Sequence, residues 1–280
     1  MRGGGGWADV LKGLLSSYFF AQLLNRTFIV DVNDYGCRLD KVLNPNSGMQ
    51  WNRQINLSNT SGDEIFNYRL GYNFKIVYEL KDKNVFEMTN KTYFKIETAV
   101  RIVDKMGENK YVQARMRELG FEPSEFSIFK QFYRLYNELF KLPERLQTAT
   151  DEMLRRAKPN NSTKLICAQV RVGGETGGGG EDWWFMDKNQ TADFWRFIRY
   201  ELLERQQMIS NYKLFVTSDR EAVKEEARQE FGEENVLLNA NTSFHFAIDK
   251  GNNHTFTKCQ MMERILVDFD FFRHCDAAVV

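Results

Sequence analysis

The sequence predicts an α/β protein whose second half is a parallel, Rossmann-like sheet. From residue 164 onwards, apolar runs of strand length alternate with helical patterns. The mostly apolar run from Lys164 to Val170 is typical of a strand buried on both faces of a sheet. It leads into Arg171 and a glycine-rich segment, which predicts a cation at the sheet edge where open α/β folds bind ligands.

The elements of this second half follow from the same pattern. We expect strands at 164–171, 212–217, 235–238 and 277–280, and helices at about 191–208, 220–230 and 256–273. Strands that alternate with helices of this length form right-handed βαβ units and a parallel sheet. Because the sequence stops within an apolar strand at Val280, we expect it to be truncated at that end.

The first half begins with glycines and then a mostly buried helix over residues 7–24. A strand is expected at 27–32. Together these make most of a βα unit that lacks its first strand, so we expect truncation at the front as well. From 40 to 109 the pattern supports no assignment, although pieces such as Lys75 to Tyr78 look strand-like.

Helical periodicity returns before the middle of the chain. Helices are expected at 111–119, 123–140 and 142–156, and residues 158–163 form a turn-rich break. The break predicts two domains, a Rossmann-like domain at 1–157 with a helical second half and an incomplete Rossmann-like domain at 164–280.

Composition excludes several classes of protein. The 280 residues are 42% hydrophobic with four prolines, as in a globular protein. Lysine plus arginine equals aspartate plus glutamate at 38 each, so no overall basic field attracts nucleic acid or an anionic membrane. No uninterrupted apolar stretch of about 18 residues predicts a membrane span. A membrane partner would therefore need a segment absent from this chain.

Glycosylation sequons are over-represented. The 22 asparagines begin nine Asn-x-Ser/Thr triplets, where roughly two would arise by chance. The triplets start at Asn25, Asn56, Asn59, Asn90, Asn160, Asn161, Asn189, Asn241 and Asn253. This excess favours the lumen of the secretory pathway, the Golgi in particular. If the protein is bacterial, we expect the cytoplasm instead. Four cysteines allow three full pairings, and buried unpaired thiols are an equal alternative.

Arg171 carries the sharpest chemical argument. A guanidinium is always charged and binds two phosphate oxygens at once, which suits a pyrophosphate. Gly173 and the glycines after it allow backbone amides to approach a ligand, or form a flexible connector. Ser218 and Asp219 follow the next strand at the same edge, where a carboxylate can accept two hydrogen bonds from guanine. Alternatively, either residue caps the following helix.

Asp268 and Asp270 form a D-x-D pattern that in other proteins holds a metal ion. Here the pair lies within a helical pattern, in which residues two apart point in widely different directions. We therefore predict no metal site.

In this order, the residues resemble a family of fucosyltransferases with a GT-B fold. It comprises the α-1,6-fucosyltransferases of animals and rhizobia, the xyloglucan fucosyltransferases of plants and the protein O-fucosyltransferases. The matching segments are Gly5 to Asp9, Leu24 to Ile29, Gln169 to Arg171, Phe215 to Asp219 and Ile265 to Val279.

The resemblance implies two Rossmann-like domains that face a donor cleft, the first on the acceptor side. It implies inverting, metal-independent transfer of fucose from GDP-fucose to a glycan or protein acceptor, with no cofactor. Arg171 would be the catalytic residue, on the pyrophosphate, and Asp219 would lie near guanine. The implied donor-binding residues are Gly5, Gly6, Asp9, Gln169, Arg171, Gly173, Ser218 and Asp219.

Departures from the family pattern keep an alternative open. Val172 replaces the second of two arginines found in the α-1,6 branch, and Gly174 stands where many relatives carry aspartate. The first loop reads Ala8-Asp9-Val10 and lacks an arginine, and the serine-rich donor segment would lie past Val280. The alternative is a catalytically degenerate domain of the same fold that binds a glycan or nucleotide. An unrelated Rossmann protein is disfavoured because neither phosphate-loop motif follows a strand.

Overall fold

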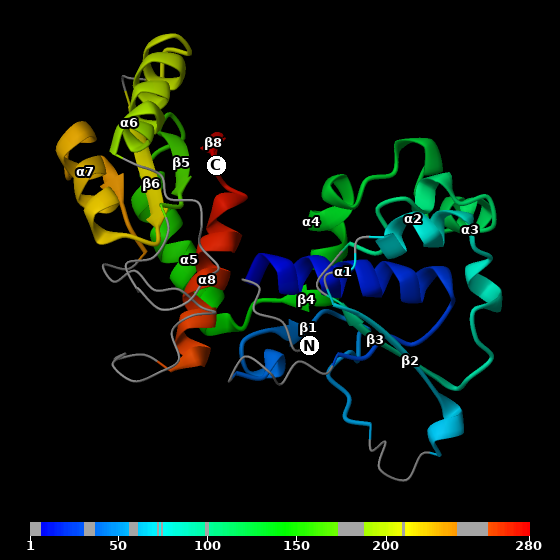
Figure 1. The fold of residues 1–280 in the computed structure, drawn as a ribbon. Helices are drawn as coiled ribbons and strands as arrows, with labels where there is room; N and C mark the ends of the chain where they lie inside the picture. Colours follow the sequence, from blue (N-terminus) through cyan, green and yellow to red (C-terminus); the bar gives the residue numbers. More distant parts are fainter. Residues whose placement is uncertain are drawn as a thin grey trace. The chain divides into compact units, whose positions relative to one another are not determined.

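The chain divides into two units, residues 1–142 and 143–280, which are described separately below (Figure 1). The computed structural model describes residues 7–30, 37–55, 61–71, 73, 75–98, 101–172, 188–208, 211–239 and 257–280. The division precedes the turn-rich break at 158–163, so helix α5 (Glu144–Ala157) belongs to the second unit. The reason is packing, because Ala157 lies in the core beneath the sheet of that unit.

The second unit is built on a four-stranded parallel sheet in the order β7-β6-β5-β8. Its strands are β5 (Lys164–Val170), β6 (Tyr212–Ser218), β7 (Val236–Leu237) and β8 (Ala277–Val279). Its remaining helices are α6 (Lys188–Phe197), continued as a π-helix over Ile198–Glu204, α7 (Glu221–Phe231) and α8 (Lys258–Phe272). The expected Rossmann-like alternation and parallel sheet are confirmed.

Helices cover both faces of this sheet, with α6 and α7 on one side and α5 and α8 on the other (Figure 1). Strand residues alternate between two buried clusters, as the pleat requires. Ile166 and Ala168 of β5 belong to the cluster with α6 and α7. Leu165 and Cys167 belong to the cluster with α5 and α8. This burial on both faces accounts for the nearly continuous apolar run in the sequence.

β5 occupies the point where the strand order reverses direction. The chain runs from β5 to β6 and β7 on one side, and then returns to pair β8 with the other side of β5. In open α/β sheets, ligands bind outside the carboxyl ends of the strands at such a switch point. The topology therefore singles out the residues that follow β5.

A disulfide joins Cys167 in β5 to Cys275 just before β8, with the Cα atoms 5.9 Å apart. This bond selects among the pairings that the sequence allowed. Asp276 reinforces the join, because one carboxylate oxygen accepts the Leu165 N–H at 2.7 Å and lies 2.9 Å from Lys158 Nζ. Although burial opposes ionisation of Asp276, these two partners outweigh it and hold the pKa below its ordinary value.

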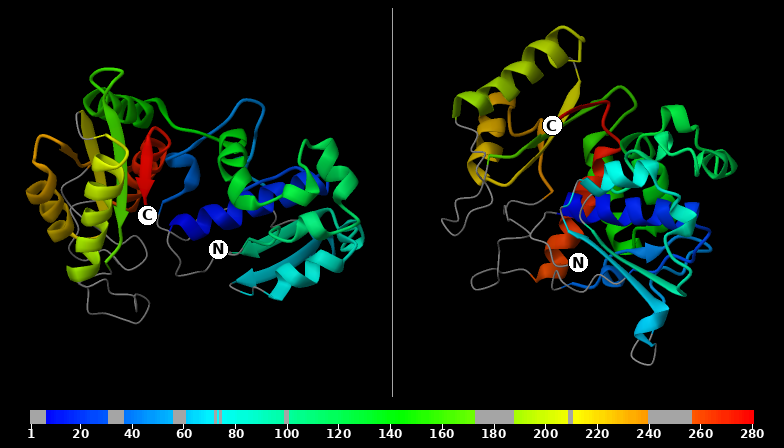
Figure 2. Two further views of the ribbon diagram at one scale, coloured as in Figure 1. Left: turned by 90° about the horizontal axis from the view of Figure 1, so that it is seen from above. Right: turned by 45° about the vertical axis from the view of Figure 1, so that its right-hand side comes forward.

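The first unit is organised around helix α1 (Trp7–Leu23), which is buried on almost all sides. Its other helices are α2 (Lys75–Asp82), α3 (Gln113–Glu118) and α4 (Ile128–Leu139). Its strands are β1 (Asn44–Pro45), β2 (Ile65–Gly71), β3 (Tyr93–Thr98) and β4 (Phe140–Lys141). Strands β2 and β3 pair in parallel, and α1 packs beside them (Figure 2). Phe20 of α1 makes an edge-to-face contact with Phe94 of β3.

One segment of the first unit that the sequence left unassigned is a helix, and one expected strand is absent from its described part. The segment from Lys75 to Tyr78 is helical rather than strand-like, because Ile76, Val77 and Leu80 are buried at helical spacing while Tyr78 is 64% exposed. Residues 27–30, the described part of the expected strand at 27–32, form no strand. The Val30 N–H donates instead to the Trp51 carbonyl oxygen at 2.8 Å.

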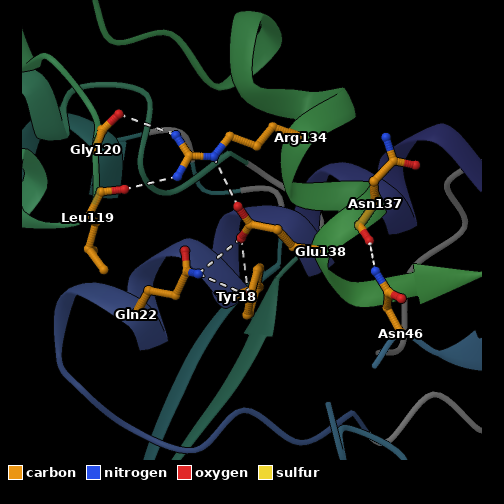
Figure 3. A network of polar contacts seen from close by, with 8 residues as sticks. All are labelled: Tyr18, Gln22, Asn46, Leu119, Gly120, Arg134, Asn137 and Glu138. Atoms are coloured by element: carbon orange, nitrogen blue, oxygen red, sulfur yellow. Dashed lines mark hydrogen bonds and ion pairs between the residues drawn. The ribbon is translucent and has the colours of Figure 1, made fainter. Parts of the chain in front are cut away.

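A polar network centred on Glu138 fastens α1 to α4 (Figure 3). Its carboxylate accepts bonds from the Tyr18 hydroxyl at 3.2 Å, Gln22 Nε2 at 3.1 Å and Arg134 Nε at 2.9 Å. Arg134 also donates to the carbonyl oxygens of Leu119 and Gly120. Burial, together with the nearby Glu138 charge, raises the pKa of Tyr18, so its hydroxyl remains a donor. The network therefore fixes the carboxyl-terminal half of α1.

Candidate functional site at the carboxyl edge of the second sheet

Arg171 is the first residue past β5, the strand at the switch point. Arg171 is exposed, while Val170 before it and Val172 after it are buried among side chains of the α6–α7 face. The buried neighbours fix the backbone on both sides of the arginine. The sequence prediction that a strand delivers this cation to the carboxyl edge of a sheet is confirmed.

Asp219 is the first residue past β6, and its carboxylate links the two strand ends. Val170 pairs with Ser218 at the last position of the β5–β6 ladder, so Arg171 and Asp219 leave adjacent strands at the same level. Oδ1 of Asp219 accepts the Val172 N–H at 2.9 Å. This bond holds the backbone immediately after Arg171.

Neither candidate acts as the side-chain cap of α7. The residue at the cap position is Arg220, and no side-chain cap bond is present there. Ser218 instead accepts the Arg220 N–H at 3.1 Å and closes the turn that precedes the helix. Ser218 therefore has a local turn role, whereas Asp219 bridges to the neighbouring strand end.

Strand alternation gathers the polar candidates on one face. Cys167 and Phe215 face α5 and α8. Side chains an even number of residues apart along a strand share a face, so Gln169 and Arg171 lie on the same face as Cys167, and Asp219 on that of Phe215. By the same alternation Asn239 follows Leu237 of β7 on that face. The carboxyl edge on the α8 side thus carries a row of polar residues from three neighbouring strands. Gln169, although within β5, is exposed there.

Asp268 of α8 adds a second carboxyl, which the sequence offered as half of a D-x-D pattern and within the segment that resembles the fucosyltransferases. Asn239 Nδ2 donates to its Oδ1 at 2.7 Å. Burial raises the pKa of Asp268 to about 7, against the bond from Asn239 and the charges of Lys224 and Arg264. An ionisable group with a strongly shifted pKa, beside the edge where open α/β sheets bind ligands, is a functional candidate. In the sequence, nothing predicted that Asn239 would be its partner.

Asp270, two residues further on, has different partners. Its Oδ1 lies 3.1 Å from Arg273 Nε. Burial of Asp270 raises its pKa, although the positive charge of Arg273 opposes this shift. The expectation that Asp268 and Asp270 diverge on a helix is confirmed. Among the described residues, no group of three or more His, Cys, Asp or Glu side chains could hold a metal ion.

The raised pKa of Asp268 predicts a pH dependence of stability. The folded protein keeps this carboxyl protonated up to about pH 7, whereas the ordinary value is 3.8. Its contribution is complete below about pH 4 and is lost as the pH rises through 7. Asp268→Asn removes this loss, so the free energy of unfolding should fall less between pH 5 and pH 8 in the variant, by on the order of 3 kcal/mol. Urea denaturation at both pH values measures it.

The matched control is Glu152→Gln, which removes an exposed negative charge from α5. Its loss of stability between pH 5 and pH 8 should equal that of the unmodified protein. If Asp268→Asn also follows the unmodified protein, the carboxyl is ionised throughout this range and the assignment is wrong.

Asp9 lies in the first turn of α1, where a carboxylate is favoured by the helix dipole. Its Oδ1 is 3.1 Å from Lys12 Nζ. The structure places it at the amino end of the helix, as the sequence predicted. Gly5, Gly6 and Gly173 lie outside the described residues, so their expected role in donor binding stays a prediction.

An open hollow of about 340 Å³ lies near the same edge but on the other face. It is lined by Gln190, Asp193, Phe194 and Val279. No cation is among these lining residues, so we place the anion-binding candidate at Arg171 rather than in this hollow.

The fold is that of known fucosyltransferases. The chain superposes on a point mutant of Arabidopsis thaliana FUT1 in complex with GDP with a TM-score of 0.64, at 12% identity over 99% of this chain and 63% of the FUT1 chain. It superposes on the fucosyltransferase NodZ from Bradyrhizobium with a TM-score of 0.56, at 14% identity over 98% of this chain and 85% of NodZ. A structure of NodZ α-1,6-fucosyltransferase soaked with GDP-fucose gives 0.53 at 15% identity, over 98% and 84% of the two chains.

The architecture is therefore α/β and similar to GT-B fucosyltransferases. The chain spans less than two thirds of the FUT1 chain that it matches. No family model matches the sequence, and no curated protein matches it. No described helix is both long and apolar enough to cross a membrane.

Proposed function

We propose that this protein binds GDP-fucose at the carboxyl edge of the second sheet and transfers fucose to a glycan or protein acceptor. One observation carries the proposal: Arg171 and Asp219 leave adjacent strands at the switch point, tied by the 2.9 Å bond from the Val172 N–H. Fucosyltransferases of the same fold, crystallised with GDP or GDP-fucose, support it.

In the proposed reaction, an acceptor hydroxyl oxygen forms a bond to C1 of fucose from the face opposite the diphosphate. The bond between C1 and the phosphate oxygen breaks, GDP leaves with the electron pair, and the hydroxyl gives up its proton. Arg171 stabilises the charge that grows on the diphosphate, without a metal ion, and Asp219 accepts hydrogen bonds from guanine. A preorganised charge of this kind lowers a barrier by about 3–4 kcal/mol.

The polar residues at this edge suit different parts of the donor. A cation at the end of β5 suits the diphosphate, and carboxyl groups beside it suit a base that presents N–H donors. Gln169 and Ser218 would contribute hydrogen bonds. The secretory pathway, the Golgi in particular, is the proposed location, because a disulfide such as Cys167–Cys275 is typical of proteins from oxidising compartments.

One observation favours a second candidate, a nucleotide- or glycan-binding domain without transferase activity. Val172 is 8% exposed and packs in the α6–α7 cluster, so this position cannot supply a second cation to the diphosphate. Such a domain would keep the binding edge without stabilising the leaving group enough for turnover.

A transfer assay separates the two candidates. The full-length protein is incubated with GDP-fucose and a panel of glycan and glycoprotein acceptors, with and without EDTA, and GDP release is followed by chromatography. GDP-mannose is the matched control for sugar recognition. The proposal predicts acceptor-dependent GDP release from GDP-fucose that EDTA leaves unchanged. Tight binding of GDP-fucose without release across the panel would support the binding domain instead.

A further inference from the structure

The described sequons fall into two groups. Asn25, Asn90, Asn160 and Asn161 lie at exposed positions. At Asn25 and Asn160 the fold itself explains the asparagine, whereas at Asn90 it does not.

Asn25 terminates α1. Its φ is +52°, and the bonds Asn25 N–H to Gln22 O and Arg26 N–H to Ala21 O close the helix in a Schellman motif. Asparagine tolerates this left-handed conformation better than most residues. The residue therefore has a backbone role at this position.

Asn160 organises the turn between α5 and β5. Its Oδ1 accepts five hydrogen bonds, two from Ser162, two from Thr163 and one from Asn211. Thr163, the third residue of the overlapping sequon at Asn161, is 2% exposed and its hydroxyl is within these bonds. This turn therefore uses its asparagine and threonine side chains to hold the chain.

Asn90 has neither of these backbone or turn roles among the described contacts. It lies in the loop between the short helix Val85–Glu87 and β3, and both Asn90 and Thr92 are exposed. Neither side chain hydrogen-bonds to another described residue. Arg26 holds the backbone of the loop, because its Nη1 donates to the carbonyl oxygens of Lys91 at 3.0 Å and Thr92 at 3.3 Å. A fixed backbone thus presents both sequon side chains to solvent.

The loop that carries Asn90 lies near the opposite end of α1 from Asp9. Arg26, which holds the Asn90 loop, follows the carboxyl end of α1, whereas Asp9 lies in its first turn. A helix of 17 residues is about 25 Å long. The loop also borders a small hollow lined in part by Phe86, which is 46% exposed and offers apolar surface that a sugar can cover.

We propose that Asn90 carries an N-linked oligosaccharide. In the modification, Asn90 Nδ2 forms a bond to C1 of the reducing-end sugar of a lipid-diphosphate-linked oligosaccharide and loses one proton. The bond between that C1 and the phosphate oxygen breaks, and the lipid diphosphate leaves with the electron pair. The proposal is independent of any transferase activity of this protein.

Peptide mapping of the full chain secreted from eukaryotic cells tests the proposal. The glycans are released by an amidase in ¹⁸O-labelled water, which marks each modified asparagine as labelled aspartate. The expected result is labelling of Asn90 in most molecules. An unlabelled Asn90 in folded, secreted protein would overturn the proposal, and this outcome needs no variant to fold.

Two variants test whether glycosylation of Asn90 depends on the complete sequon. Thr92→Ala keeps Asn90 but should abolish its labelling and lower the mass by one glycan, while Thr92→Ser should retain both. Labelling of Asn90 that persists in Thr92→Ala would contradict enzymatic N-glycosylation at this sequon.

Discussion

The Arg171→Ala variant should lose about 10²–10³-fold in kcat for fucosyl transfer while retaining its fold. Arg171 is exposed at the end of β5, and the buried residues Val170 and Val172 on either side of it anchor the strand end. Its removal takes away the charge that stabilises the departing diphosphate. The GDP-release assay gives the rate, and circular dichroism with thermal unfolding verifies the fold.

Two comparisons make this result specific. Arg171→Lys keeps the charge but cannot bind two phosphate oxygens in a planar fork, so it should retain only part of the activity. Arg205→Ala removes an exposed arginine that pairs with Glu201 on the π-helix, and it should leave kcat unchanged. A near-normal rate in Arg171→Ala would remove this residue from the mechanism.

Loss of the Cys167–Cys275 disulfide should have the largest effect on stability. The two cysteines are 108 residues apart, and closing a loop of about this length stabilises a fold by about 4–5 kcal/mol in the chain-entropy model. The bond joins β5 to the entry of β8, so its loss should fall on the second sheet. Native-state hydrogen exchange of the β5 and β8 amides measures the loss in that unit.

Single and double variants separate the cross-link from packing. Cys167 is fully buried, so Cys167→Ala also removes packing around it. If the disulfide dominates, Cys167→Ala, Cys275→Ala and the double variant should lose nearly equal stability, because either substitution already breaks the bond. Small losses that simply add in the double variant would show that the bond contributes little.

The second unit was predictable because its local patterns and its tertiary structure agree. The strand expected at 164–171 ends at Val170, and the helix expected at 220–230 is α7. Burial on both sheet faces makes β5 apolar, and a strongly apolar run is the clearest signal a sequence carries. The first unit contains strands that lack this signal. In β3 only Thr98 is fully buried, so its pairing with β2 left no clear alternation to detect.

The site was predictable residue by residue but not as an arrangement. Arg171 and Asp219 could be placed at strand ends from local pattern alone. That β5 lies between β6 and β8, which makes the end of β5 the switch point, depends on strand order that no local pattern contains. For the same reason, the pairing of Cys167 with Cys275 could not be chosen among three possibilities. Asn239 and Asp268, 29 residues apart, meet only after the sheet has folded.

Calorimetric titration of GDP tests the central claim most directly. GDP and GDP-fucose are titrated into the full-length protein and its Arg171→Ala variant, each with and without EDTA. We predict micromolar binding of both ligands that EDTA leaves unchanged and that the variant loses. The absence of binding by folded protein, or binding that Arg171→Ala leaves intact, would contradict a donor site at this edge of the sheet.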